Sequence, residues 1–206
     1  MSIIEAVLDH LIDTEGGLSN VVGDRGGLTK YGITKPFYAR IKGIKVSQVK
    51  DENIINLTVE GAKDLYRKYW KICKVDYLPV AVQHIYFDMC VNHGDTNGAK
   101  ILQRALSDLK LNPGIDGKVG PLTIKKASLA GPEFLAAILA RRTMFYDAIV
   151  AKDPSQKKFY KGWINNRVKW FDKNSLTAIT EAKIIVKDSV SLIDKIKGLF
   201  KKGESI

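Results

Sequence analysis

Residues 14–34 read TEGGLSNVVGDRGGLTKYGIT, and this stretch decides the fold. Just before it, apolar residues recur at helical spacing, which predicts a helix that ends within the stretch: Val7, Leu8, Leu11 and Ile12. Gly16-Gly17 has the backbone freedom that a helix C-terminal cap requires. Glu15 is therefore expected in the last helical turn, at the negative end of the helix dipole. A carboxylate is disfavoured there, so we expect the pKa of Glu15 to be raised, as a proton donor near neutral pH requires.

A small hairpin is expected after the glycines, because short extended runs alternate with glycine-rich turns. This hairpin would carry Asp24, Thr29 and Tyr31. If residues 28–33 form one strand, alternate side chains, including those of Thr29 and Tyr31, point to the same face. Tyr31 then either faces a cleft or packs the hairpin on the core. One carboxyl group on a helix end, Glu15, and another on the hairpin, Asp24, would make an acid–base pair.

Two motifs in this stretch resemble the signature of glycoside hydrolase family 108, which comprises N-acetylmuramidases of phage endolysins and bacterial toxin-release systems: Glu15-Gly16-Gly17 and Asp24-x-Gly26-Gly27-x-Thr29-Lys30-Tyr31-Gly32-Ile33-Thr34. The order of Glu, Asp and Thr also resembles phage-type lysozymes, although the gap of five from Asp24 to Thr29 is one shorter than usual there. The resemblance implies that Glu15 is the general acid and that Asp24 is an ionised carboxylate that orients water or stabilises the transition state. Thr29 would help to place that water. Likeness to the phage enzymes favours inversion, which needs carboxyl groups about 6.5–9.5 Å apart.

The length and the net charge of the chain limit the classes of protein to which it can belong. At 206 residues the chain fits one domain of moderate size or two small ones that share a core. Its formal net charge of +11 favours a polyanionic partner, which is a nucleic acid, an anionic membrane or a cell wall. The basic residues are spread along the chain without a nucleic-acid-binding motif, so no nucleic-acid partner is expected.

Cysteines, histidines and the N-terminus set further expectations. Cys73 and Cys90 lie in apolar helical contexts and are expected to be reduced and buried. The three histidines lack metal-ligand spacing, so we expect neither a metal nor another cofactor. Residues 1–5 show no cleavable signal, and no apolar run is long enough to span a bilayer. We therefore expect synthesis in the cytoplasm and action on the periplasmic cell wall after holin-type or dedicated release.

Later segments supply candidate substrate-binding residues besides Tyr31. Asn92 ends a largely apolar, central helix expected over 80–92, where it either caps the helix or hydrogen-bonds substrate. Arg142 lies in a long helix expected over 132–151; it is one of three arginines, with Arg141 and Arg167, that either approach the catalytic carboxyl groups or serve the structure. Trp163 lies in the last helix of the globular part.

Three further motifs extend the family resemblance beyond the hairpin. They resemble the start, an internal loop and the end of peptidoglycan-associated helical domains: Phe87-Asp88-x-x-Val91-Asn92-x-Gly94, Asp116-Gly117-x-x-Gly120-Pro121-x-Thr123 and Gly162-Trp163-Ile164-Asn165-x-Arg167-Val168. In the loop, Asp116 is expected to cap neighbouring backbone amides. The resemblance covers roughly residues 3–171.

The C-terminal segment has a different pattern. From about Lys173, apolar residues recur at helical spacing among lysines, which is typical of a basic amphipathic helix. This helix either docks on the domain, self-associates or contacts an anionic membrane. We expect the chain to be a monomer.

Together these features predict a mainly α, lysozyme-like fold with one small β-hairpin next to the helix that carries Glu15. We expect a muramidase segment over 1–78, a helical peptidoglycan-domain segment over 79–172 that shares its core, and the amphipathic helix over 173–206.

The resemblance implies an endolysin-type muramidase that hydrolyses the β-1,4 bond between N-acetylmuramic acid and N-acetylglucosamine, with peptidoglycan as its partner. A lytic transglycosylase is an alternative, since it needs one catalytic acid and leaves anhydromuramic ends. A non-catalytic peptidoglycan-binding protein is a second alternative and would release no soluble fragments. A basic membrane-active protein that acts through its tail is a third.

Overall fold

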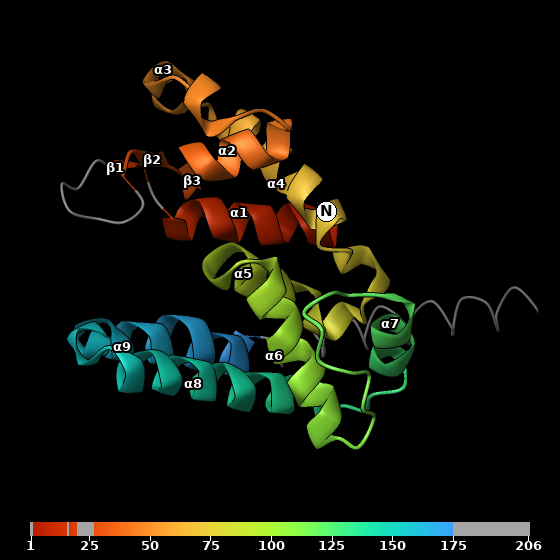
Figure 1. Ribbon diagram of the computed structural model, residues 1–206. Coiled ribbons are helices and arrows are strands. Elements are labelled where there is room, and N and C mark those ends of the chain that lie inside the picture. Colours follow the sequence, from red (N-terminus) through yellow and green to blue (C-terminus); the bar gives the residue numbers. More distant parts are fainter. Residues whose placement is uncertain (1, 16, 20–26, 175–206) are drawn as a thin grey trace, which may run out of the picture. The chain divides into compact units, whose positions relative to one another are not determined.

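The computed structural model describes residues 2–15, 17–19 and 27–174 (Figure 1). The chain divides into two compact units, one of Met1–Ala99 with Asp116–Ile124 and one of Lys100–Ile115 with Lys125–Ile206. Most of the described residues are helical, and the sheet that they form has three short strands. This confirms the predicted mainly α, lysozyme-like class with a small sheet. The functional division into 1–78, 79–172 and 173–206 stays a prediction.

Helix α1 (Ile3–Glu15) forms and ends where the sequence predicts. Its apolar stripe is buried in the first unit, with Leu8 fully inaccessible to solvent. Burial of such a stripe removes apolar surface from water, which is the main force that holds an amphipathic helix in place. The position of Glu15 at the end of a buried helix is therefore confirmed.

The small sheet follows α1 directly. Strands β1 (Leu18–Ser19), β2 (Thr29–Lys30) and β3 (Ile33–Thr34) pair antiparallel in that order. The expectation of one strand over 28–33 is wrong, because a two-residue turn at Tyr31-Gly32 separates β2 from β3. Their φ angles are +53° and +74°, as a tight hairpin turn with two left-handed residues requires. Tyr31 is thus a turn residue and not part of an alternating strand.

Short helices with predicted caps complete the N-terminal part of the first unit. Helix α2 (Lys35–Lys42) begins at Thr34, whose hydroxyl accepts from the backbone N–H of Phe37 at 3.3 Å, and ends at Gly43 with φ +68°. Helix α4 (Val59–Ile72) begins in the same way at Thr58. Two 3₁₀ turns, η1 (Val46–Gln48) and η2 (Val75–Tyr77), and helix α3 (Asp51–Ile55) connect these elements. Thr34 and Thr58 thus cap the starts of these two helices, and Gly43 ends α2.

Helix α5 (Val80–His93) is the central helix of the first unit. Most of its apolar residues are buried, and Phe87 packs against the rings of Tyr66, Tyr69 and Trp70 from α4, with centroid distances of 6.2, 6.0 and 4.9 Å. Cys73 and Cys90 are buried free thiols, as expected. The predicted central position of this helix is confirmed.

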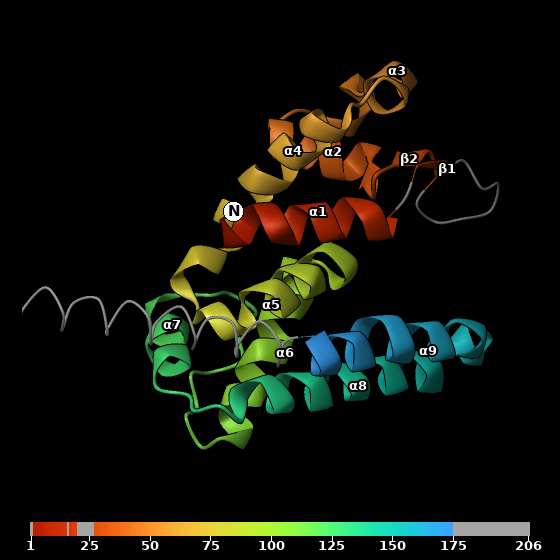
Figure 2. The same ribbon diagram turned by 180° about the vertical axis from the view of Figure 1, so that it is seen from behind.

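The second unit is built on a pair of helices. Helix α9 (Lys157–Trp163) contacts α8 (Phe134–Lys152) and runs beside it in Figures 1 and 2. A 3₁₀ turn, η3 (Pro154–Gln156), joins them, and a π-helical segment, η4 (Ile164–Lys169), follows α9. An Arg141–Asp108 ion pair fastens α8 to α6 (Asp95–Asp108).

Two helices continue from one unit into the other. They are α6 and α7 (Pro121–Ser128). In the loop before α7, the backbone N–H of Lys118 donates to the Asp116 carboxylate at 2.9 Å, so the capping role predicted for Asp116 is confirmed.

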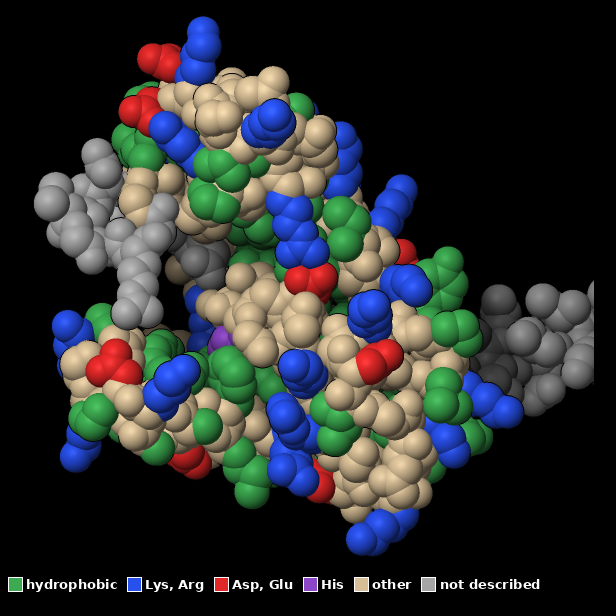
Figure 3. All heavy atoms as spheres, in the orientation of Figure 1, with side chains coloured by type: hydrophobic (Ala, Val, Ile, Leu, Met, Phe, Trp, Pro, Cys, Tyr) green, Lys and Arg blue, Asp and Glu red, His purple; other side chains and the backbone are tan. Residues whose placement is uncertain are grey.

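The distribution of surface charge and the apolarity of the helices are relevant to the predicted partners, which are an anionic polymer and a membrane. Lysine and arginine side chains are spread over the face drawn in Figure 3 and do not gather into one stripe. Among the described helices, none combines the length and apolarity that a membrane crossing needs. The amphipathic helix predicted over 173–206 falls almost wholly outside the described residues.

Candidate active site

The structure describes the backbone at two of the three predicted catalytic positions, Glu15 at the end of α1 and Thr29 in the small sheet. Glu15 is the last residue of α1, and the strand that begins three residues later, β1, pairs with β2. In this register Thr29 lies opposite Ser19, and on its other side opposite Thr34. Thr29 is therefore held beside the strand that follows α1.

The two predicted catalytic carboxyl groups belong to Glu15 and Asp24. The side chain of Glu15 and the whole of Asp24 fall outside the described part of the structure. The raised pKa of Glu15 and the catalytic roles of Glu15, Asp24 and Thr29 stay predictions.

The turn at Tyr31 is held from two sides. The buried Tyr66 hydroxyl on α4 donates to the Tyr31 carbonyl oxygen at 2.9 Å, and the Lys30 ammonium group donates to the carbonyl oxygen of Ile55 on α3 at 2.7 Å. A bulky residue with positive φ costs about 1–3 kcal/mol and persists only where its surroundings enforce it. Tyr66 supplies that enforcement, and the half-buried ring of Tyr31 lies 5.5 Å from the Lys30 ammonium nitrogen.

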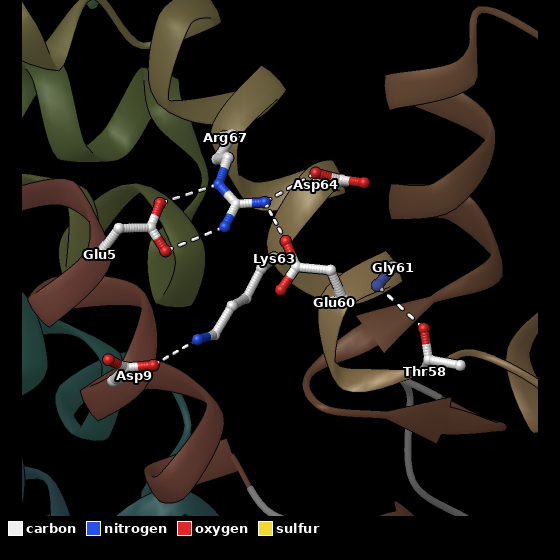
Figure 4. Close-up of polar contacts among 8 residues, drawn as sticks. All are labelled: Glu5, Asp9, Thr58, Glu60, Gly61, Lys63, Asp64 and Arg67. Carbon is white, nitrogen blue, oxygen red and sulfur yellow. Dashed lines mark hydrogen bonds and ion pairs between the residues drawn. The ribbon is translucent and has the colours of Figure 1, made fainter.

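Ion pairs fix α1 against α4 (Figure 4). Arg67 forms a bidentate pair with Glu5, with both N···O distances 2.9 Å, and Lys63 pairs with Asp9. The Arg67 guanidinium also donates to Glu60 at 2.6 Å and to Asp64 at 2.7 Å. The hydrogen bonds from Arg67 lower the pKa of Glu5, which therefore stays ionised. These contacts fix the N-terminal half of the helix that ends at Glu15.

A histidine pair fixes the other half of α1 against α5. His10 Nδ1 lies 3.1 Å from His84 Nε2, and the rings meet edge to face. The Thr14 hydroxyl donates to the His10 carbonyl oxygen at 2.7 Å, so at 3.3 Å it accepts from His10 Nε2. With a neutral His10 ring, Nδ1 is then the acceptor and His84 Nε2 donates to it. This chain of hydrogen bonds ends one residue before Glu15.

The environment of His84 agrees with a neutral ring. Its pKa is lowered to about 4, mainly by burial and also by the neighbouring His10, while Asp88 opposes the shift. Sequence reasoning missed this pair, because 74 residues separate its members and nothing in their local patterns links them. Among the described residues, no group of three histidine, cysteine or acidic side chains is placed to hold a metal.

Asn92 makes a hydrogen bond at the end of α5, as expected if its side chain caps that helix. Its side-chain amide donates to the carbonyl oxygen of Asp88 at 2.8 Å, in the last turn of α5. The side chain is exposed. Its role as a substrate-binding residue stays a prediction.

Arg142 and Trp163 both lie in the second unit. Arg142 is fully buried; its guanidinium donates to the carbonyl oxygen of Arg167 at 2.9 Å and lies 5.7 Å from the ring centroids of both Tyr146 and Phe171. It thus joins α8 to the π-helical segment. Of the two roles considered for the arginines, structural support or an approach to the catalytic carboxyl groups, Arg142 has the structural one. Trp163 is half-buried and stacks on Tyr146, with the centroids 5.1 Å apart and the planes at 18°. Substrate binding by either residue stays a prediction.

Comparisons with known proteins agree with this architecture. Residues 8–94 match the family described as glycosyl hydrolase 108, and residues 97–168 match the predicted peptidoglycan domain. The solved structure of SagA from Brucella abortus is similar, with a TM-score of 0.69 and 26% identity over 84% of this chain and 94% of that one. No curated protein matches the chain. Residues 8–94 thus match the glycosyl hydrolase 108 family and residues 97–168 match a predicted peptidoglycan domain, which together indicate a glycoside hydrolase that acts on peptidoglycan.

Proposed function

We propose that this chain is a muramidase that hydrolyses the β-1,4 bond between N-acetylmuramic acid and N-acetylglucosamine. One observation carries the proposal. The family-matched segment 8–94 ends its first helix at Glu15 and pairs the chain that follows with the strand that bears Thr29. A glycosidase needs a proton donor and a partner group on the other side of the scissile bond. A helix end beside a short sheet provides two such positions.

In the proposed mechanism Glu15 protonates the leaving glycosidic oxygen. We expect the C-terminal end of α1 to disfavour the ionised carboxylate of Glu15, so that its proton stays available. Asp24, ionised, orients the attacking water or stabilises the oxocarbenium-like transition state, and Thr29 helps to place that water. Water then attacks the anomeric carbon from the opposite face, with inversion, and gives up its proton to the Asp24 carboxylate. Inversion requires carboxyl groups about 6.5–9.5 Å apart.

The second unit would contribute sugar contacts. Trp163 stacks on both Tyr146 and Phe159, and Phe159 is 48% exposed. Exposed aromatic faces of this kind pack against the apolar faces of sugar rings. This arrangement supports a glycan contact beside Trp163, on the exposed ring of Phe159.

The setting of the activity is part of the proposal. We propose that the enzyme acts as an endolysin-type lytic protein on the wall and reaches the periplasm by a holin or a dedicated release route. The substrate class supports this, because peptidoglycan lies outside the cytoplasmic membrane. We further propose that the monomer is active and that the C-terminal segment contacts anionic membrane.

Purified peptidoglycan tests the proposal directly. The wild-type chain should release soluble fragments, and Glu15→Gln should release none while it keeps its circular-dichroism spectrum. Asp13→Asn is the matched control, because it neutralises an exposed acid two residues away on the same helix and should keep wild-type activity. Activity in Glu15→Gln would overturn the assignment of the acid. Binding without any release by the wild type would instead favour a non-catalytic wall-binding protein.

A further inference from the structure

A groove between α2 and α4 in the first unit is not used by the proposed catalytic machinery. Its volume is about 430 Å³, within the range of about 300–1,000 Å³ that small-ligand sites occupy. One wall comes from α2, and the other comes from residues of α4 that recur every three to four positions and so share a helix face. The residues that matter for recognition are Tyr38, Lys42, Leu57, Leu65, Lys68 and Lys71.

The arginine at one side of the groove is fully paired with carboxylates. Arg67 and Asp64 both line it, and they are paired with one another at 2.7 Å. Arg67 is also held by Glu5 and Glu60, as Figure 4 shows. This cluster therefore offers no unpaired positive charge to a ligand.

The three lysines that line the groove differ from Arg67 in their pairing. Lys42, Lys68 and Lys71 are exposed, and within the described residues none of them forms an ion pair. The Lys42 ammonium nitrogen lies 5.7 Å from the centroid of the Tyr38 ring, which also lines the groove. Three like charges around one cavity repel each other, and an anionic ligand would relieve that repulsion.

The rest of the lining indicates what kind of anion fits. Leu65 is almost fully buried, and Leu57 and Tyr38 are half-buried, so apolar side chains line the groove together with the lysines. Lysine presents a mobile point charge and not the planar fork of arginine, which suits separate carboxylates on a flexible chain. A ligand with a short hydrocarbon backbone and two or three carboxylates matches both features, whereas a flat bilayer surface does not enter a groove.

We propose that this groove binds the carboxylate-bearing peptide stem of peptidoglycan and thereby holds the wall while the glycan strand is cleaved elsewhere on the chain. The proposal rests on the proposed function for the identity of the wall polymer. It adds a second recognition site, for peptide, on a face of the hydrolase segment to which nothing else assigns a role.

Calorimetric titration of the full chain tests the site without any catalysis. The probe is the free tetrapeptide L-Ala–γ-D-Glu–diaminopimelate–D-Ala. The double variant Lys68→Gln/Lys71→Gln should bind it at least tenfold more weakly than the wild type. The control Lys125→Gln/Lys152→Gln removes the same charge from two exposed lysines outside the groove and should bind as the wild type does.

A kinetic comparison separates this site from the catalytic one. We call the double variant Lys68→Gln/Lys71→Gln the groove variant. On whole peptidoglycan its KM should be raised at least tenfold, with little change in kcat. On glycan strands freed of peptide by an amidase it should match the wild type. A wild type that cleaves neither substrate would refute the proposed function, while the titration would still decide the peptide site.

Three results would overturn the inference. One is the absence of tetrapeptide binding by the wild type. The second is equal affinity in the groove variant and the control. The third is that the wild type binds poly(glycerol phosphate) or anionic phospholipid vesicles but not the tetrapeptide, and that the groove variant loses this binding.

Discussion

Acidification should loosen the first unit through the His10–His84 pair. The neutral His84 ring donates to His10, and its pKa in the folded protein is lowered to about 4 by burial, against 6.5 for an unperturbed histidine. The unfolded chain therefore binds a proton at this position over the range in which the folded chain does not. Stability from this pair is fully present above pH 6.5, falls as the pH drops, and levels off below about pH 4.

The size of the effect follows from the two pKa values. They differ by about 2.5 units, and each unit corresponds to about 1.36 kcal/mol. Linkage then gives a loss in the free energy of unfolding of about 2 kcal/mol at pH 5 and about 3 kcal/mol at pH 4, relative to neutral pH. Such a loss is a large fraction of the stability of a typical domain.

Urea unfolding of the wild type and of His84→Gln at pH 4, 5, 6 and 7.5 measures this effect. Glutamine keeps an N–H donor for His10 but does not titrate. Acidic groups with lowered pKa values, such as Glu5 and Asp95, are present in both proteins, so their contributions cancel in the comparison. The wild type should lose about 3 kcal/mol more than the variant between pH 7.5 and pH 4. Parallel pH profiles for the two proteins would refute the reasoning.

Three substitutions test other parts of the account. Tyr66→Phe removes the hydrogen bond to the Tyr31 carbonyl oxygen and should cost about 1 kcal/mol of stability in urea unfolding. In steady-state assays on peptidoglycan it should lower kcat, and an unchanged kcat would mean that the turn does not position the site. Gly98→Ala should destabilise by about 1–3 kcal/mol in the same unfolding assay, because its Cβ would lie 3.1 Å from the sulfur and 3.2 Å from the backbone nitrogen of Cys90; wild-type stability would contradict that close packing. Arg142→Met should lower the melting temperature measured by calorimetry and leave KM unchanged, because the guanidinium is buried in a structural contact; a raised KM at full stability would instead support substrate binding.

Local sequence signals predicted the elements that frame the site. The end of α1 at Glu15 follows from the glycines after it and from the apolar stripe before it, and Thr34 and Thr58 start helices because their hydroxyl groups cap backbone N–H groups. These are interactions between residues a few positions apart. They are therefore readable from the sequence alone.

Long-range contacts were not readable in this way. The strand expected over 28–33 is broken by the turn at Tyr31-Gly32, and the Tyr31 carbonyl oxygen in that turn accepts from a hydroxyl group 35 residues away. The histidine pair and the Arg67–Glu5 pair likewise join segments more than 60 residues apart. Arg142 showed no local sign of burial, because its partners come from the π-helical segment and from Phe171.

The most direct test of the central claim is mass spectrometry of the fragments released from peptidoglycan in water enriched in ¹⁸O. A muramidase that adds water across the glycosidic bond should place one ¹⁸O at each new reducing muramic acid end, and Glu15→Gln should yield no such ends. Unlabelled anhydromuramic ends, or labelled muramic ends that form as fast with Glu15→Gln as with the wild type, would contradict the account.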